Sequence, residues 1–413
     1  MRSNYDTCRM QNGMRLGFAP LPDSECTAVS IHIPAGSRDD PPHAEGLAHF
    51  AEHMIFKGTE RRDAKAISTD VENTGASLDA FTSEDQTVYE ARGDAETLPL
   101  LIDVLCDIVW HSTFQAHEIE LEREVIAEEI VMYRETPSEH ISDLLSAALW
   151  GDHPLGQPIS GSLQSIQNIQ QRDLIAFTER HYRREDVVIA VAGPHQLGEI
   201  VQLLESRLPT ATPPVHPPRF EPIAGRNRSV LETRDTQQLQ LALAYRSYPR
   251  TDPKRHALNL LAMILGEGAS SRLFMRLREE RGLCYQVSCH TSLMTDTGSL
   301  EIHAGLDPSS RQEALDCIQA EIDDLIAHGP DVEELARAKR LYASQSRAGM
   351  ESTAAHASWA GDCLMVRDHI LSPSQSLASI LQVTAHEIQE TAREVCVPDR
   401  FAIAEIGPPP SSP

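Results

Sequence analysis

The chain has 413 residues, of which 41% are hydrophobic, and its formal net charge is −25. This length favours two or more domains with sizeable cores, and the negative charge argues against nucleic acid or an anionic membrane as a partner. No run approaches the ~18 apolar residues that a membrane span needs. The 8 cysteines are scattered without a Cys-x-x-Cys pair, which indicates reduced, mostly buried thiols of a cytoplasmic protein.

Residues 1–21 contain short strand-like runs on either side of Asn12-Gly13, a pair that is typical of a β-hairpin turn. They lack the apolar stretch of a secretory signal, so we expect no cleaved signal peptide and a cytoplasmic location. A further strand-like run follows at residues 28–33.

His49, Glu52 and His53 then form the pattern His-x-x-Glu-His in a segment that favours a helix, with Gly58 just past its expected end. Positions i and i+4 share one face of a helix, so both imidazoles can reach one metal ion while Glu52 points to the same side. Imidazoles suit zinc, and a catalytic zinc needs a third protein ligand. The alternative is a pair of partly buried histidines without a metal, because short motifs also arise by chance.

A carboxylate from a neighbouring helix can supply that third ligand. Residues 117–135 are strongly helical in pattern and end before Thr136-Pro137. Within them Glu122 and Glu129 lie two turns apart on one stripe. One of the two can bind the metal while the other orients a ligand.

A proline-rich stretch divides the chain nearly in half and predicts a semi-rigid linker at residues 209–226. We therefore expect an N-terminal catalytic domain at 1–208, a C-terminal domain at 227–407 and a disordered tail at 408–413.

The two halves also echo each other, which indicates one duplicated α/β unit. The run at 186–194 matches that at 400–408, both strand-like and closed by Gly-Pro, and 28–33 corresponds to 239–244. The same alignment places Ala338 opposite Glu122 and Gln345 opposite Glu129, and the second-half helix around 258–265 carries no histidine pair. The candidate metal set is thus complete in the first half and missing as a set from the second.

The segment from His49 to His53, the Met-Ile-Phe-Lys-Gly-Thr that follows, and a glutamate 76 residues after the second histidine resemble the pitrilysin, insulysin and mitochondrial processing peptidase family of zinc metallopeptidases. The resemblance covers nearly the whole chain and is to half-length bacterial members. It implies one Zn²⁺ per chain, bound by His49, His53 and Glu129. Glu52 would be the general base, and Glu122 would orient a ligand histidine.

Two further stretches resemble the substrate-binding parts of that family. Residues 74–89 are similar to the strand beside the zinc, which implies substrate contacts at Ala80, Phe81 and Thr82; Asp79 stands where the family more often has asparagine. Residues 271–285 resemble the family's substrate-holding arginine and tyrosine, here Arg278 and Tyr285.

The resemblance implies an α+β fold of two homologous α/β domains, each a mainly antiparallel sheet with helices packed on it. Together they would form one half of a clamshell that a second subunit completes, in a homodimer or in a heterodimer with a related chain. The expected function is a zinc metalloendopeptidase that cleaves unfolded peptides, or leader-like and presequence-like segments, inside this dimeric chamber.

Two other functions stay open. One is a dedicated processor of leader peptides in the biosynthesis of a modified natural product. The other is a non-catalytic partner subunit of a peptidase-like complex, which the complete set of His49, Glu52, His53 and Glu129 argues against. A serine hydrolase is disfavoured because the sequence lacks a Gly-x-Ser-x-Gly motif.

Overall fold

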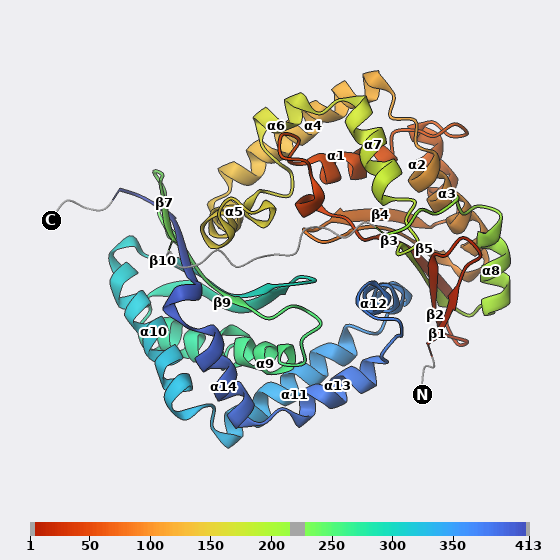
Figure 1. Ribbon diagram of the computed structural model, residues 1–413. Helices are drawn as coiled ribbons and strands as arrows, with labels where there is room; N and C mark the ends of the chain where they lie inside the picture. The colour runs from red at the N-terminus through yellow and green to blue at the C-terminus, as the bar shows by residue number, and fades with distance from the viewer. Residues whose placement is uncertain (1–4, 215–227, 410–413) are drawn as a thin grey trace. The chain divides into compact units, whose positions relative to one another are not determined.

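The computed structural model describes residues 5–214 and 228–409, which form two compact units, each built on one sheet (Figure 1). The first unit contains residues 5–130, 158–214 and 347–373, and the second contains 131–157, 228–346 and 374–409. The units therefore differ from the expected domains 1–208 and 227–407, because each takes a segment from the other half of the chain. Residues 215–226 of the expected linker and 410–413 of the expected tail lie outside the described residues.

The first sheet has six strands in the order β1-β2-β6-β3-β5-β4, in which the β2–β6 pair alone is parallel. In chain order the strands are β1 (Asp6–Arg9), β2 (Arg15–Pro20), β3 (Cys26–Ile33), β4 (Ser77–Thr82), β5 (Thr87–Asp94) and β6 (Val188–Gly193). The hairpin predicted at Asn12-Gly13 is confirmed, since it joins β1 to β2 and the Asn12 side chain accepts a hydrogen bond from the Met14 amide at 3.1 Å.

The second sheet repeats this order with five strands, β7-β11-β8-β10-β9. Its strands are β7 (Arg228–Thr233), β8 (Leu239–Ser247), β9 (Cys284–Leu293), β10 (Gly298–Leu306) and β11 (Phe401–Gly407). Here too one neighbouring pair, β7–β11, is parallel and the others are antiparallel. The strand predicted at 186–194 and its counterpart at 400–408 occupy equivalent places beside β3 and β8, so the duplication and the mainly antiparallel α+β fold are confirmed.

Helices cover both sheets. Those that lie mainly in the first unit are α1 (Leu47–Ile55), α2 (Ala64–Glu72), α3 (Leu98–His111), α4 (Ala116–Glu135), α6 (Leu163–Asn168), α7 (Gln171–His181), α8 (Leu197–Glu205) and α12 (Thr353–Val366). Those of the second unit are α5 (Pro137–Trp150), α9 (Arg255–Gly266), a π-helical segment (Phe274–Glu280), α10 (Arg311–His328), α11 (Val332–Ala348), α13 (Pro373–Gln382) and α14 (Ala385–Val395). Among the described residues no helix is long and apolar enough to cross a membrane.

Each sheet packs against one helix that comes from the opposite half of the chain. Helix α12, drawn in blue, lies against β2, β3 and β6 of the first sheet (Figure 1). Helix α5 packs on β7, β8 and β11 of the second sheet, where Ile141, Leu145 and Ala148 meet Ala242 and Ala244. This exchange is the reason that the compact units are not continuous in sequence.

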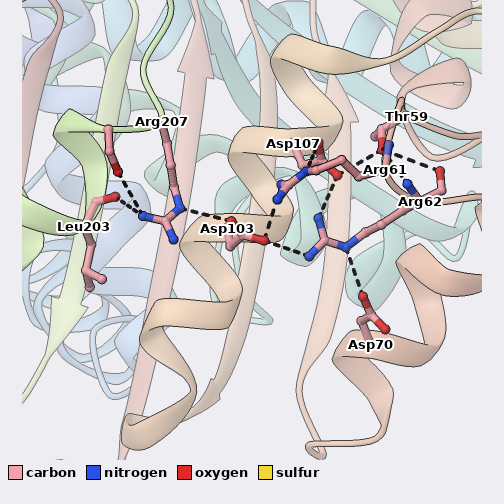
Figure 2. A network of polar contacts seen from close by, with 9 residues as sticks. Thr59, Arg61, Arg62, Asp70, Asp103, Asp107, Leu203 and Arg207 are labelled. Atoms are coloured by element: carbon pink, nitrogen blue, oxygen red, sulfur yellow. Dashed lines mark hydrogen bonds and ion pairs between the residues drawn. The ribbon is translucent and has the colours of Figure 1, made fainter.

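The segment that follows α1 is held by a partly buried polar network (Figure 2). Arg62 donates to Asp103 at 2.7 Å, to Asp107 at 2.7 Å and to Asp70 at 2.9 Å. The Thr59 hydroxyl donates to Asp107 at 2.9 Å, and Arg207 from just after α8 reaches Asp103 at 3.1 Å. Asp107 is almost fully buried, so its charge depends on these partners. The network ties the α1–α2 connection to α3.

Candidate metal centre and active site

Helix α1 carries the His-x-x-Glu-His motif. Asp40, in the loop that precedes the helix, caps its first turn. The Asp40 carboxylate accepts hydrogen bonds from the backbone amides of Gly46 at 2.7 Å and Ala48 at 2.8 Å, which satisfies donors that the first turn leaves unpaired. Gly46 adopts φ 91°, and a Cβ there would lie 2.5 Å from the Ser160 carbonyl oxygen. Glycine is therefore required at this position. The predicted helix is confirmed, but it ends at Ile55, with Phe56 rather than Gly58 as its C-terminal cap.

The structure brings His49, His53 and Glu129 together. The Nε2 atoms of the two histidines are 3.3 Å apart, and carboxylate oxygens of Glu129 lie 3.7 Å from His49 Nε2 and 3.6 Å from His53 Nε2. Helix α4, which carries Glu129, spans the residues predicted for it to within one position. The two histidines are one turn apart on α1, as the i, i+4 spacing predicts.

These distances fit a zinc ion. Ligand atoms about 2 Å from a shared zinc ion, the usual length of zinc–nitrogen and zinc–oxygen bonds, lie about 3.3–3.5 Å from one another, close to the separations seen here. Two imidazoles and a carboxylate also favour zinc over harder ions such as magnesium, which prefer oxygen ligands alone. Burial lowers the pKa of His49 to about 3, with the neighbouring His53 adding to the effect, so this imidazole is neutral at physiological pH. A neutral imidazole is the form that binds a metal.

Glu122 contacts His53 at Nδ1, the ring nitrogen that does not face Glu129. Its Oε1 lies 2.8 Å from His53 Nδ1, and its Oε2 lies 2.5 Å from the Lys57 ammonium. Burial alone would raise the pKa of Glu122, but the hydrogen bonds from His53 and Lys57 outweigh it and lower the pKa. The carboxylate is thus charged, and it directs His53 Nε2 toward Glu129. By contrast, the buried Nδ1 of His49 has no hydrogen-bond partner among the described residues.

Glu52 lies on the same side of α1 and makes a different contact. Its Oε2 accepts a hydrogen bond of 2.6 Å from the hydroxyl of Thr82, the last residue of β4. Burial raises the pKa of Glu52, and the Thr82 hydrogen bond and the charge of His53 oppose this rise. Glu52 is therefore a partly buried carboxylate that is linked to the edge strand and is not one of the three converging ligands.

The predicted substrate-contacting residues fall in two places. Ala80, Phe81 and Thr82 are in β4, which pairs within the described sheet with β5 alone and leaves its other edge open. Phe81 is exposed, whereas Thr82 turns toward Glu52. Arg278 and Tyr285 lie together in the second unit, where the guanidinium carbon is 5.1 Å from the tyrosine ring centroid. Tyr285 is 75% exposed, so its ring is available to a ligand.

Sequence reasoning missed two contributors to this site, Lys57 and Asp40, and one contact of the predicted residue Thr82. Lys57 forms an ion pair with Glu122, and its position four residues after His53 could have indicated that it lies on the same face of the helix. Thr82 contacts Glu52 as well as lying in the predicted substrate strand. Asp40 caps α1 from six residues before Gly46, a spacing that matches no local capping pattern.

In the described part of the second unit, the residues that align with the candidate metal set have other surroundings. Gln345 on α11, the residue aligned with Glu129, donates a hydrogen bond to Glu267 at 2.9 Å, and Ala338, aligned with Glu122, is buried. Helix α9 occupies the place expected for residues 258–265 without a histidine pair.

Comparison with known proteins agrees with this division. Residues 21–162 match the family described as insulinase (peptidase family M16), and residues 168–342 match the peptidase M16 inactive domain. An uncharacterized zinc protease of Streptomyces coelicolor is 32% identical over 97% of this chain and 88% of its own length. The uncharacterized zinc protease YmxG of Bacillus subtilis is 30% identical over 97% of both chains.

A solved protease from Helicobacter pylori has the same fold, with a TM-score of 0.92 and 22% identity over 98% of this chain and 100% of its own. Because the sequence relatives span nearly the whole chain and both halves match M16 domains, the protein belongs to the insulinase family of peptidases, family M16.

Proposed function

We propose that this protein is a zinc metalloendopeptidase that cleaves unfolded peptides, with His49, His53 and Glu129 as the zinc ligands. The observation that carries the proposal is the convergence of these three side chains at 3.3 to 3.7 Å, with Glu52 close by but outside the ligand set. Three protein ligands leave one coordination position for water, as in other catalytic zinc sites. The relatives named as zinc proteases support a zinc-dependent peptidase.

A zinc ion held by His49, His53 and Glu129 would lower the pKa of its water toward ~7 and would polarise the carbonyl of the scissile peptide bond. Glu52 takes the proton from the attacking water and passes it to the leaving amine, because it has a carboxylate free of the ligand set on the same helix face. The Thr82 hydroxyl holds one oxygen of Glu52 at 2.6 Å and so fixes the direction of the carboxylate. Glu122 and Lys57 keep His53 in the tautomer that directs Nε2 to the ligand cluster.

The open edge of β4 is the proposed peptide-binding strand. An extended peptide can add to this edge through main-chain hydrogen bonds, and the end of the strand is linked to Glu52 through Thr82. Phe81 offers an exposed apolar surface for a peptide side chain. Since β-augmentation requires an extended segment, folded proteins would be poor substrates.

Arg278 and Tyr285 are proposed to bind substrate from the second unit. The guanidinium carbon of Arg278 lies 4.8 Å from the Phe274 ring centroid and 5.1 Å from that of Tyr285, so it is held between two aromatic rings. Its N–H groups can donate to peptide carbonyls, while the Tyr285 hydroxyl donates near the reacting carbonyl. We propose that two subunits, identical or related, enclose the peptide and that this pair serves the zinc site of the other subunit.

The Glu52→Gln variant tests this function. Gln keeps the shape and the contact with Thr82 but cannot accept the proton, so the rate of peptide cleavage should fall by ~10²–10⁴ while bound zinc stays unchanged. Glu72→Gln, an exposed residue at the end of α2, is the matched control and should cleave at the wild-type rate. Chelator treatment of the wild type should abolish cleavage, and zinc should restore it. Near-normal cleavage by Glu52→Gln would show that the base lies elsewhere.

A further inference from the structure

We propose a second divalent-cation site in the second unit, formed by His290, Glu301 and His303. Among the described residues, two groups of three His, Cys, Asp or Glu side chains have ligand atoms within 4.8 Å of one another. The first is the His49 cluster, and this is the other. The inference does not depend on peptidase activity.

Strand register creates the group. Glu301 on β10 lies directly opposite His290 on β9, and His303 is two residues further along β10, so all three side chains share one face of the sheet. The two imidazole rings stack with their centroids 5.1 Å apart. A site on two paired strands is held more rigidly than one on a loop.

The two histidine–carboxylate distances in the group are those of ligands around an ion. Both histidines direct Nε2 at the same oxygen, Glu301 Oε2, at 3.5 Å from His290 and 3.4 Å from His303. Hydrogen bonds of this kind are usually 2.7–2.9 Å long, and other His–carboxylate contacts in this protein are 2.8 Å for His53–Glu122 and 2.9 Å for His328–Asp324. The contacts of Glu301 are therefore long for hydrogen bonds but close to the 3.6 and 3.7 Å edges of the His49 cluster.

The remaining oxygen of Glu301 is already occupied. Ser299 Oγ donates to Oε1 at 2.6 Å, which orients the carboxylate and leaves Oε2 for the histidines. Glu301 is mostly buried, and Oε2 is the oxygen that it presents to both imidazoles.

The donor set determines the class of ion. Two imidazoles and one carboxylate favour zinc, cobalt or nickel over magnesium and calcium, which prefer oxygen ligands. The His290 side chain is 53% exposed, whereas those of Glu301 and His303 are mostly buried, so an ion can enter from solvent and exchange. His303 also borders a cavity of about 260 Å³ that Tyr285 and Gln286 line, which places the ion beside a proposed substrate contact.

Zinc titration of the full chain by calorimetry tests the proposal in a His49→Ala, His53→Ala background, which removes the first cluster. This background should bind one zinc per chain. Adding His290→Ala and His303→Ala should abolish that binding, and adding Glu301→Gln, which keeps the side-chain shape, should do the same. Millimolar magnesium should not compete with zinc.

His328→Ala in the same background is the matched control. His328 contacts the Asp324 carboxylate but belongs to neither of the two three-residue groups found among the described residues. This control should leave the one-zinc binding intact. Because His290 is exposed, His290→Ala alone also tests the site without risk to the fold, and circular dichroism of each variant checks this. The proposal is wrong if the His49→Ala, His53→Ala chain binds no zinc, or if it binds equally well without His290, Glu301 and His303.

Discussion

Replacement of Glu122 tests how much the support of one ligand contributes to zinc binding. The carboxylate makes two contacts, at 2.8 Å to His53 Nδ1 and at 2.5 Å to Lys57 Nζ, and it is buried. Glu122→Gln retains an oxygen that can accept from His53 but loses the charge, and it leaves Lys57 facing a neutral amide. Glu122→Ala also removes the hydrogen bond and frees the imidazole to rotate.

Changes to the groups that orient metal ligands cost 10–100-fold in metal affinity or activity, about 1.4 to 2.7 kcal/mol at 1.36 kcal/mol per tenfold. We expect Glu122→Gln near the lower end, about tenfold, and Glu122→Ala near the upper end, about 100-fold. Competition with a zinc-binding dye measures the affinity, and peptide cleavage at saturating zinc measures the rate separately.

Glu120→Gln on the same helix is the control, because Glu120 is 71% exposed and contacts Arg123 rather than the zinc ligands. Its zinc affinity should stay within about twofold of the wild type, since an exposed ion pair contributes little. Equal zinc affinities for Glu122→Ala and Glu120→Gln would refute the role of Glu122 in orienting His53.

Three further outcomes are expected. Asp107→Ala should lower the free energy of unfolding by about 3 kcal/mol, because it removes the buried partner of Arg62. Asp70→Ala should lower it by less than about 1 kcal/mol, because the Asp70 side chain is 43% exposed. Equal losses in urea unfolding would contradict this role of Asp107. Arg278→Ala and Tyr285→Phe should slow cleavage without releasing zinc, and mixing Arg278→Ala with Glu52→Gln subunits should restore activity; no gain after confirmed subunit exchange would refute action on the other subunit's site. The charge of −25 predicts faster cleavage of Lys-rich than of matched Glu-rich peptides, with a difference that shrinks as salt rises from 0.1 M to 1 M; equal rates at low salt would remove the charge argument.

Much of the fold was predictable because local patterns specify it. The Asn12-Gly13 hairpin, the helix of residues 117–135 and the paired strands 186–194 and 400–408 each follow from turn chemistry or periodicity. The exchange of α5 and α12 was not predictable, because an apolar helix face does not reveal which sheet it will cover. The convergence of His49, His53 and Glu129 was also predictable, because the two histidines are neighbours on one helix and the resemblance supplied Glu129.

The contacts that could not be predicted from the sequence join segments that are far apart in the chain. Nothing local pairs Thr82 with Glu52, or Asp40 with Gly46, since both contacts depend on how the strand and the preceding loop pack against α1. Glu301 and His303 show the strand spacing of two, but His290 joins them through a strand register that the sequence alone does not give.

The most direct test of the central claim is zinc X-ray absorption on a His290→Ala, His303→Ala chain, which keeps the first cluster alone. We expect about one zinc per chain with nitrogen and oxygen neighbours at ~2.0–2.2 Å and no sulfur, and loss of that zinc when His49 and His53 are also replaced by alanine. Sulfur neighbours at ~2.3 Å, or zinc that remains at full occupancy after the loss of both histidines, would contradict it.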